Sequence, residues 1–126
     1  MNIAIWIAQG LLAFAFLAAG GMKLASPREK LIASGKSMAW AEGFSASSIK
    51  LIGTAEVLGA VGIILPAALG VAPVLSPIAA IGLALVALGA VIVHLKRGEP
   101  AAVGAPLLLC LIAIFVAVTR LGSYAL

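Results

Sequence analysis

The chain has 126 residues, of which 64% are hydrophobic and only 10% are charged, with a net charge of +4. A soluble domain is about half apolar and about one-quarter charged, and a globule of this size leaves much of its surface in water. The composition therefore excludes a soluble globular domain and a disordered chain, and its single cysteine excludes a disulfide scaffold. A lipid bilayer is the solvent that this composition fits.

Four long apolar runs follow one another along the chain, each near the length of a membrane-spanning helix, which needs about 20 residues. Every backbone amide in lipid must be hydrogen-bonded internally, so continuous runs predict helices, whereas barrel strands would alternate apolar and polar residues. We therefore expect an all-α integral membrane four-helix bundle that forms one domain over residues 1–126. Its expected spans are about residues 3–22, 49–69, 74–95 and 103–122.

Positive charge is confined almost entirely to two of the connections between these runs, and only Arg120 lies elsewhere. Because Lys and Arg favour cytoplasmic loops, we expect both basic connections in the cytoplasm and both termini outside, in a multi-pass protein of the bacterial cytoplasmic (inner) membrane. The positive charge then sets the orientation in the membrane and interacts with lipid headgroups. We therefore expect no nucleic-acid binding. The residues of the two connections are Lys23, Arg28, Lys30, Lys36, Lys50, Lys96 and Arg97.

The connection over residues 25–48 is the only extended polar segment. Residues 26–29 read Ser-Pro-Arg-Glu, which places a capping serine, a proline at the first helical position and a glutamate at the third. This pattern predicts a short helix to about Ser34, with Gly35 just past its end. Trp40 suits the headgroup boundary, because its ring is apolar and its N–H is polar. We expect a short interfacial helix and a loop on the cytoplasmic leaflet.

Glu56 lies inside the second predicted span. An ionised carboxylate alone at that depth costs roughly 2–3 kcal/mol or more, so it must be paired, protonated or in contact with water. Glycine and alanine share its helix face and permit close helix contact, so Glu56 is expected to point into the bundle. Because side chains lean toward a helix N-terminus, Lys23 and His94 approach the same level from neighbouring spans. We hypothesise a Lys23–Glu56 ion pair with His94 as a hydrogen-bond partner, as a buried polar cluster or ligand site.

Each of these residues also has a purely structural interpretation. Lys23 can snorkel to the headgroups, His94 can be an ordinary interface residue, and Glu56 can belong to an ion pair that fixes helix register. At the opposite end of the bundle, Gln9 and Arg120 are expected to form a secondary polar pair, with an outer-interface anchor as the alternative for Arg120.

Motifs for metal binding and catalysis are missing from the sequence. One histidine and no aspartate leave no plausible metal set. Cys110 is the only cysteine, so it forms no internal disulfide or CxxC pair, and we expect a small buried side chain. Without a nucleotide-binding glycine motif or a catalytic triad, the chain alone is not expected to carry nicotinamide or flavin chemistry. Its status as an enzyme stays open, and we lean against it.

Several short motifs follow one another in a set order. Residues 16–24 read FLAAGGMKL, residues 52–60 read IGTAEVLGA, residues 90–94 read AVIVH, and the fourth span ends near Arg120. This order resembles the DoxX-like family of small bacterial four-helix membrane proteins, over nearly the whole chain. The resemblance implies a left-handed bundle in the cytoplasmic membrane and an association with thiosulfate–quinone oxidoreduction and membrane redox complexes.

The resemblance also places Lys23, Glu56 and His94 at the polar positions of the family pattern. We consider three functions for the chain. The first is a membrane component of a redox or stress-linked complex that binds quinone or another lipophilic ligand near these residues, with a redox protein as partner. The second is a small proton-coupled transporter that uses Glu56, and the third is a structural scaffold. Beyond quinone or lipid we expect no cofactor. The glycine-rich surface permits a homo-oligomer.

Overall fold

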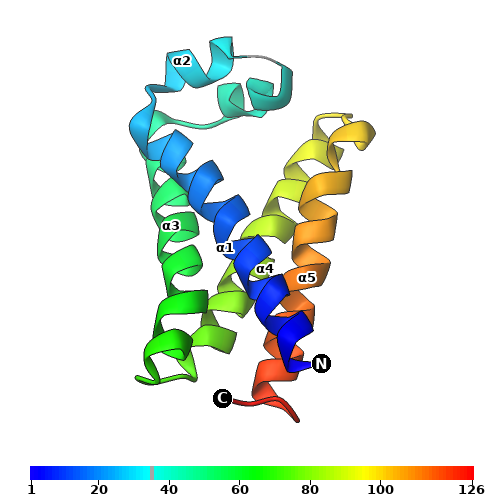
Figure 1. Cartoon of the computed structure of the whole chain (residues 1–126). Coiled ribbons are helices and arrows are strands. Elements are labelled where there is room, and N and C mark those ends of the chain that lie inside the picture. Colours follow the sequence, from blue (N-terminus) through cyan, green and yellow to red (C-terminus); the bar gives the residue numbers. More distant parts are fainter. Residues whose placement is uncertain (35) are drawn as a thin grey trace.

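The computed structural model (Figure 1) describes residues 1–34 and 36–126, and in these ranges the chain is helical with no strand. Four of the described helices are long and apolar enough to cross a membrane, which confirms the predicted all-α four-helix bundle. The long helices are α1 (Asn2–Ala25), α3 (Ala46–Leu69), α4 (Leu75–Lys96) and α5 (Gly104–Leu121). The short elements are α2 (Arg28–Ala33) and the 3₁₀ segments η1 (Lys36–Gly43) and η2 (Pro100–Ala102).

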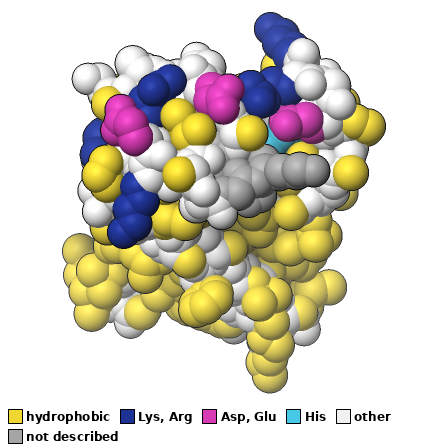
Figure 2. All heavy atoms as spheres, turned by 90° about the horizontal axis from the view of Figure 1, so that it is seen from above, with side chains coloured by type: hydrophobic (Ala, Val, Ile, Leu, Met, Phe, Trp, Pro, Cys, Tyr) yellow, Lys and Arg dark blue, Asp and Glu magenta, His cyan; other side chains and the backbone are white. Residues whose placement is uncertain are grey.

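The long helices pack in sequence order, α1 against α3, α3 against α4 and α4 against α5, and α1 also contacts α5. One end of the bundle carries α2, η1 and η2, and we call it the loop end (Figure 1). The other end carries both chain termini and the α3–α4 turn, and we call it the terminal end. Both basic connections lie at the loop end, where Lys, Arg and Glu side chains gather on the surface (Figure 2).

Two glycines set the close approach of α1 and α3. A Cβ atom on Gly20 would lie 2.7 Å from the carbonyl oxygen of Gly53, and one on Gly53 would lie 3.0 Å from that of Gly20. No larger residue fits at either position without moving a helix, so the absence of a side chain allows the two backbones to touch. This contact places Lys23 and Glu56, each three residues after one of these glycines, at neighbouring levels of the bundle.

The buried core is small in proportion to the chain, and the outer surface is apolar. Helix faces away from the core expose many large apolar side chains, among them Ile3, Phe14, Leu51 and Leu85. In water such a surface would be strongly unfavourable, whereas lipid solvates it. The central core is made of Ala8, Leu12, Phe16, Ala60, Ile63, Ala80, Leu83, Ala87, Cys110, Ala113, Val116 and Ala117.

The predicted capping box before α2 does not form. Ser26 instead ends α1, with its N–H bonded to the carbonyl oxygen of Met22, so its side chain does not cap the next helix. Pro27 is consequently the N-cap of α2 rather than its first residue, and no side-chain hydrogen bond caps that helix. The predicted stop at Gly35 lies outside the described residues. A serine does cap α3, where the Ser45 hydroxyl accepts from the Ser48 N–H at 3.1 Å.

Hydrogen bonds from Arg28 tie the segment between α1 and α3 together. Its Nε donates to the carbonyl oxygen of Phe44 at 2.7 Å, and its Nη2 donates to that of Glu42 at 2.9 Å. These bonds join the start of α2 to the end of η1. Leu31, Ala41 and Ile49 form a small separate core beneath this segment. The segment is therefore a packed cover over the loop end rather than a loose loop.

The ammonium group of Lys50 closes the end of α1. It donates to the carbonyl oxygens of Lys23, Leu24 and Ser26 at 2.9, 2.8 and 3.0 Å. The last carbonyl groups of a helix have no partner within the helix, and a cation there both satisfies them and suits the helix dipole. Lys50 thus fixes α3 to the end of α1 beside Lys23.

Candidate functional site

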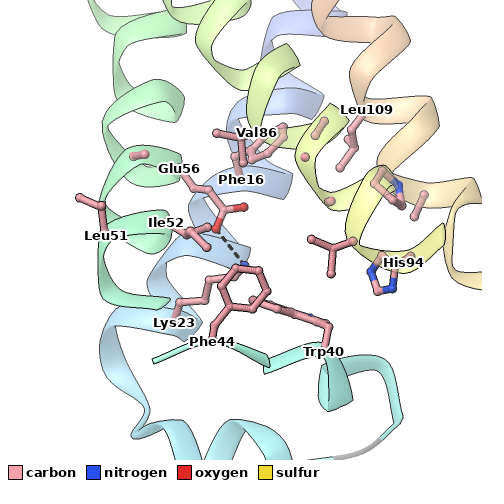
Figure 3. A pocket seen from close by; sticks show the side chains of 17 residues that line it. Phe16, Lys23, Trp40, Phe44, Leu51, Ile52, Glu56, Val86, His94 and Leu109 are labelled. Carbon is pink, nitrogen blue, oxygen red and sulfur yellow. Dashed lines mark ion pairs between the residues drawn. The ribbon is translucent and has the colours of Figure 1, made fainter. Parts of the chain in front are cut away.

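An ion pair joins α1 and α3 inside the loop end. Lys23 Nζ lies 2.8 Å from Glu56 Oε1, with the two side chains 9% and 7% exposed. The contact has the distance of an ion pair but not the angles of a hydrogen bond, so Oε1 has no hydrogen-bond partner among the described residues. The other carboxylate oxygen of Glu56 points away from Lys23, toward the side chains that line the opposite wall of a pocket (Figure 3). The pair therefore keeps hydrogen-bonding capacity that its protein neighbours do not use.

A cavity of about 500 Å³ borders this ion pair, and we call it the loop-end cavity. Its walls come from all four long helices, and Trp40 and Phe44 from the covering segment lie across one side (Figure 3). The volume is within the usual range for small-molecule sites, about 300–1,000 Å³. Most of its lining is apolar, with a few polar groups. The residues labelled in Figure 3 are Phe16, Lys23, Trp40, Phe44, Leu51, Ile52, Glu56, Val86, His94 and Leu109.

Two aromatic rings of the covering segment stand at the ion pair. Trp40 and Phe44 meet edge to face, with ring centroids 5.5 Å apart. Lys23 Nζ lies 5.6 Å from the centroid of a Trp40 ring, within the distance of a cation–π contact. Among the described residues, the ammonium group also donates a long hydrogen bond of 3.4 Å to the carbonyl oxygen of Ala19. Trp40, which the sequence places at the headgroup boundary, is thus also part of the cavity wall.

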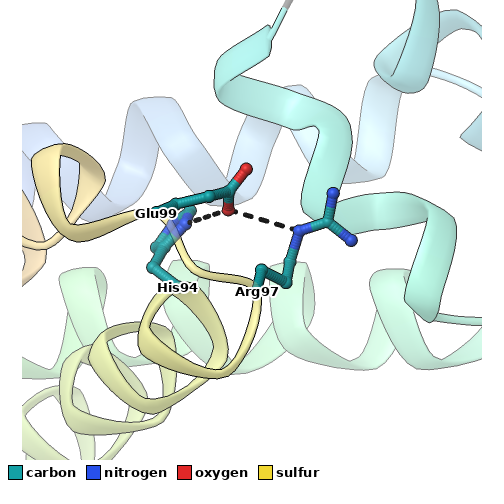
Figure 4. Close-up of polar contacts among 3 residues, drawn as sticks. All are labelled: His94, Arg97 and Glu99. Atoms are coloured by element: carbon teal, nitrogen blue, oxygen red, sulfur yellow. Dashed lines mark hydrogen bonds and ion pairs between the residues drawn. The ribbon is translucent and has the colours of Figure 1, made fainter.

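His94 lines the same cavity. The hypothesis that it forms a hydrogen bond with the Lys23–Glu56 pair is wrong, because its partner is Glu99. Its Nδ1 lies 3.0 Å from Glu99 Oε1, and Arg97 Nε donates to that same oxygen at 3.2 Å (Figure 4). The reason is the turn after α4. Gly98 has a positive φ of 70°, which reverses the chain and returns Glu99 to the side of His94.

Glu99 is the site residue that the sequence reasoning missed. The hydrogen bond from His94, together with the charge of Arg97, holds the pKa of the Glu99 carboxyl below its ordinary value, against a smaller opposing effect of burial. The available signal was a glycine between a helix end and an acidic residue, five positions after the histidine. That signal is common in loops, so it does not single out Glu99 by itself.

At the terminal end the structure brings Gln9 and Arg120 together. Arg120 Nε donates to Gln9 Oε1 at 2.8 Å. Gln9 Nε2 in turn donates to the carbonyl oxygen of Ile63 at 2.7 Å and to Ser76 Oγ at 3.1 Å. Ser76 Oγ also donates to the Ile63 carbonyl oxygen at 2.7 Å. This terminal-end cluster of Gln9, Ser76 and Arg120 joins all four long helices.

The hydrogen-bond partners of Arg120 are neutral groups, and its buried Nη2 has no hydrogen-bond partner among the described residues. Its Nη1 donates to Asn2 Oδ1 at 2.6 Å and to the carbonyl oxygen of Tyr124 at 3.0 Å. The guanidinium also stacks over the Trp6 ring at 5.4 Å from its centroid. The side chain is buried, with 3% of the residue exposed. This arrangement packs a cation into the bundle.

Cys110 is buried in α5, and its Sγ lies 3.6 Å from the carbonyl oxygen of Ala84. Within residues 1–34 and 36–126, no cluster of three His, Cys, Asp or Glu side chains is placed to hold a metal ion.

A sequence model of the DoxX-like family matches residues 7–116, which is most of the chain. The match includes Lys23, Glu56, His94 and Glu99, and it ends before Arg120. No curated protein and no solved structure matches the chain significantly.

Proposed function

The chain belongs to the DoxX-like family, and on that premise we propose that it is the membrane component of a redox or stress-linked complex. We propose that it binds quinone, or another lipophilic molecule with a polar head, in the loop-end cavity. The observation that supports this function is the cavity itself, an apolar space of about 500 Å³ bordered by a buried ion pair. Long helices with apolar outer faces make the protein a multi-pass membrane protein.

The cavity suits a molecule that arrives through the bilayer. Some of its lining residues are also exposed on the outer helix surface: Leu51 is 72% exposed, and Ala55 and Ala105 are exposed as well. These residues form a rim on α3 and α5 that faces lipid. A lipophilic molecule passing this rim keeps its tail among apolar side chains while its head reaches Lys23 and Glu56.

Lys23 supplies the recognition of the head. An ammonium group donates charge-assisted hydrogen bonds, which are stronger than those between neutral groups, and the carbonyl oxygens of a quinone accept them. Glu56 holds the ammonium group in place, and its second oxygen points away from Lys23. Trp40 and Phe44 offer ring faces and edges to a planar head. The chain would act with a redox partner protein, since electrons must come from a separate centre.

Equilibrium binding of a short-chain benzoquinone to the protein in lipid nanodiscs tests the proposal. We expect saturable binding by the wild type. Lys23→Met should weaken it about 10-fold or more, because a hydrogen bond to a charged donor contributes about 1.5–3 kcal/mol. Lys30→Met makes the same chemical change at an exposed position outside the cavity and should leave the affinity unchanged. Non-saturable uptake that is equal in all three proteins would contradict the proposal.

Separate assays test the two alternative functions, a small transporter and a structural scaffold. Proton-coupled efflux in proteoliposomes that is lost in Glu56→Gln would favour a small transporter. A structural scaffold would show neither efflux nor saturable quinone binding, and Glu56→Gln would change only the stability of the bundle. Co-purification of a flavin- or haem-bearing subunit would support the redox complex over both.

The proposal includes the orientation expected from the charges, with the loop end in the cytoplasm, both termini outside, and the bacterial inner membrane as the site. Thiol labelling of intact cells tests it in a Cys110→Ala background. Ser34→Cys and Gly98→Cys, both at the loop end, should be protected from an impermeant reagent added outside. Labelling of these positions without permeabilisation would reverse the orientation.

A further inference from the structure

His94, a further polar residue of the loop-end cavity, forms a hydrogen bond in which donor and acceptor can be assigned. His94 is the only histidine of the chain, and its Nδ1 is 3.0 Å from Glu99 Oε1. Glu99 keeps its charge at neutral pH, since its pKa is lowered by the hydrogen bond from His94 and by Arg97. An ionised carboxylate only accepts hydrogen bonds, so Nδ1 must carry the hydrogen (Figure 4).

This tautomer leaves Nε2 of a neutral His94 with a lone pair. Among the described residues Nε2 has no hydrogen-bond partner, and the side chain lines the loop-end cavity. A molecule in the cavity therefore meets a hydrogen-bond acceptor at His94 on α4, whereas Lys23 on α1 can only donate. A carbonyl oxygen fits Lys23 but is repelled at Nε2, where a hydroxyl group is required.

The two oppositely charged side chains that line the cavity form a pair. Lys23 faces Glu56 at 2.8 Å, so this pair adds no net charge to the cavity lining. An ionised carboxylate or phosphate head would add an unbalanced charge to a mostly apolar space, at a large desolvation cost. The paired charges and the apolar lining of the cavity therefore favour a neutral head.

We propose that His94, held in one tautomer by Glu99, accepts a hydrogen bond from a ring hydroxyl of the bound molecule, so that the cavity prefers a lipophilic quinol to the corresponding quinone. This inference rests on the proposed binding function and adds the form of the ligand to it. Glu99 acts as a positioning residue, because it touches His94 and not the ligand. Lys23 and Glu56 hold the other side of the same head.

Nitrogen NMR of the ligand-free protein labelled with ¹⁵N-histidine tests the tautomer. The single histidine gives one pair of ring nitrogens, and we expect the Nδ1–H form in the wild type. Glu99→Gln should reduce or reverse that preference, because an amide can also donate to Nδ1. Glu42→Gln removes a carboxylate at the same end of the molecule without touching His94, and it should behave as the wild type. An Nε2–H form in the wild type would overturn the inference.

Competitive binding of a short-chain benzoquinone and its hydroquinone, kept anaerobic in nanodiscs, tests the recognition. We expect the wild type and Glu42→Gln to bind the hydroquinone about 10-fold more tightly, the effect of about one hydrogen bond. The preference should fall toward equality in Glu99→Gln and in His94→Leu. Equal binding of both forms by the wild type would overturn the inference and leave the proposed function standing. Binding of neither form would overturn both.

Discussion

The two ends of the bundle each bury a charged side chain, yet they differ in what surrounds it. At the terminal end, Gln9 and Ser76 are fully buried, and Arg120 donates to side chains and backbone at 2.6–3.0 Å. At the loop end, Lys23 and Glu56 meet at 2.8 Å beside a cavity of about 500 Å³. The first arrangement is a hydrogen-bonded network in which Arg120 Nη2 has no partner among the described residues, beside a smaller cavity of about 240 Å³. The second is an ion pair at the larger cavity, in which Glu56 Oε1 has no hydrogen-bond partner among the described residues.

This difference separates a stabilising cluster from a candidate binding site. A buried polar group within a packed network contributes to stability because its removal leaves partners without hydrogen bonds. A polar group at a cavity can exchange its partners for those of a ligand. We therefore expect the terminal-end cluster to dominate the stability of the bundle and the loop-end cavity to dominate its binding.

The largest expected effect is that of Arg120→Ala. The change leaves Gln9 Oε1 and Asn2 Oδ1 without their donor, and we expect the free energy of unfolding to fall by about 2–4 kcal/mol. Unfolding by titration with sodium dodecyl sulfate measures it. The affinity for a short-chain benzoquinone should stay the same in the protein that remains folded. A lost affinity with unchanged stability would reverse the roles of the two ends.

The next effect concerns the contact that places the ion pair. A methyl group at Gly20 would lie 2.7 Å from the carbonyl oxygen of Gly53, so Gly20→Ala must push α1 away from α3. We expect a loss of about 1–3 kcal/mol in the free energy of unfolding, as for overpacking, together with weaker quinone binding. Gly21→Ala is the control, because a Cβ there has no atom within 4 Å. Equal free energies of unfolding for the two variants would show that the close contact between α1 and α3 at Gly20 does not contribute to stability.

The ion pair itself should contribute less to stability than the hydrogen-bonded network. Lys23→Met leaves Glu56 beside a cavity that can admit water or headgroups, so we expect a loss of only about 1–2 kcal/mol. The double variant Lys23→Met, Glu56→Gln should regain part of the lost free energy of unfolding, because it buries no unpaired charge. A double-mutant cycle measures this coupling. A loss greater than that of Arg120→Ala would contradict the comparison.

The smallest effect is the pH dependence due to Glu99. Its pKa is lowered in the folded protein, so its stabilising effect is full above the ordinary glutamate pKa and disappears as the pH falls through the lowered value. The wild type should therefore be slightly more stable than Glu99→Gln at neutral pH and equal to it in acid. Unfolding titrations at several pH values measure the difference. A difference that grows toward acid pH would have the wrong sign.

The spans could be predicted from the sequence because lipid imposes length and composition on each of them. The proximity of Lys23 and Glu56 could be predicted as well, since helix geometry alone brings side chains of neighbouring spans to one level. The observed helices α1 and α3 run about one turn further toward the loop end than expected. These extra turns contain Lys23, Ser47 and Ser48, so hydropathy does not mark them as part of the apolar runs.

The partner of His94 and the place of Trp40 could not be predicted in this way. The first depends on a reversal at Gly98 and the second on a 3₁₀ segment, and neither has a periodicity that a sequence displays. The capping pattern before α2 was misleading because Ser26 belongs to the end of α1 and does not cap α2. Where one helix follows another after one or two residues, the same residue can end the first helix or cap the second, and the sequence pattern does not say which.

Tryptophan fluorescence tests the central claim most directly, because the chain has only two tryptophans and they lie at opposite ends. In Trp6→Phe the remaining Trp40 lines the cavity, and in Trp40→Phe the remaining Trp6 stacks on Arg120. Titration with a short-chain benzoquinone in nanodiscs should quench Trp40 saturably and Trp6 only weakly and linearly. Equal, linear quenching of both tryptophans would mean that the quinone stays in the lipid and that the cavity is not its binding site.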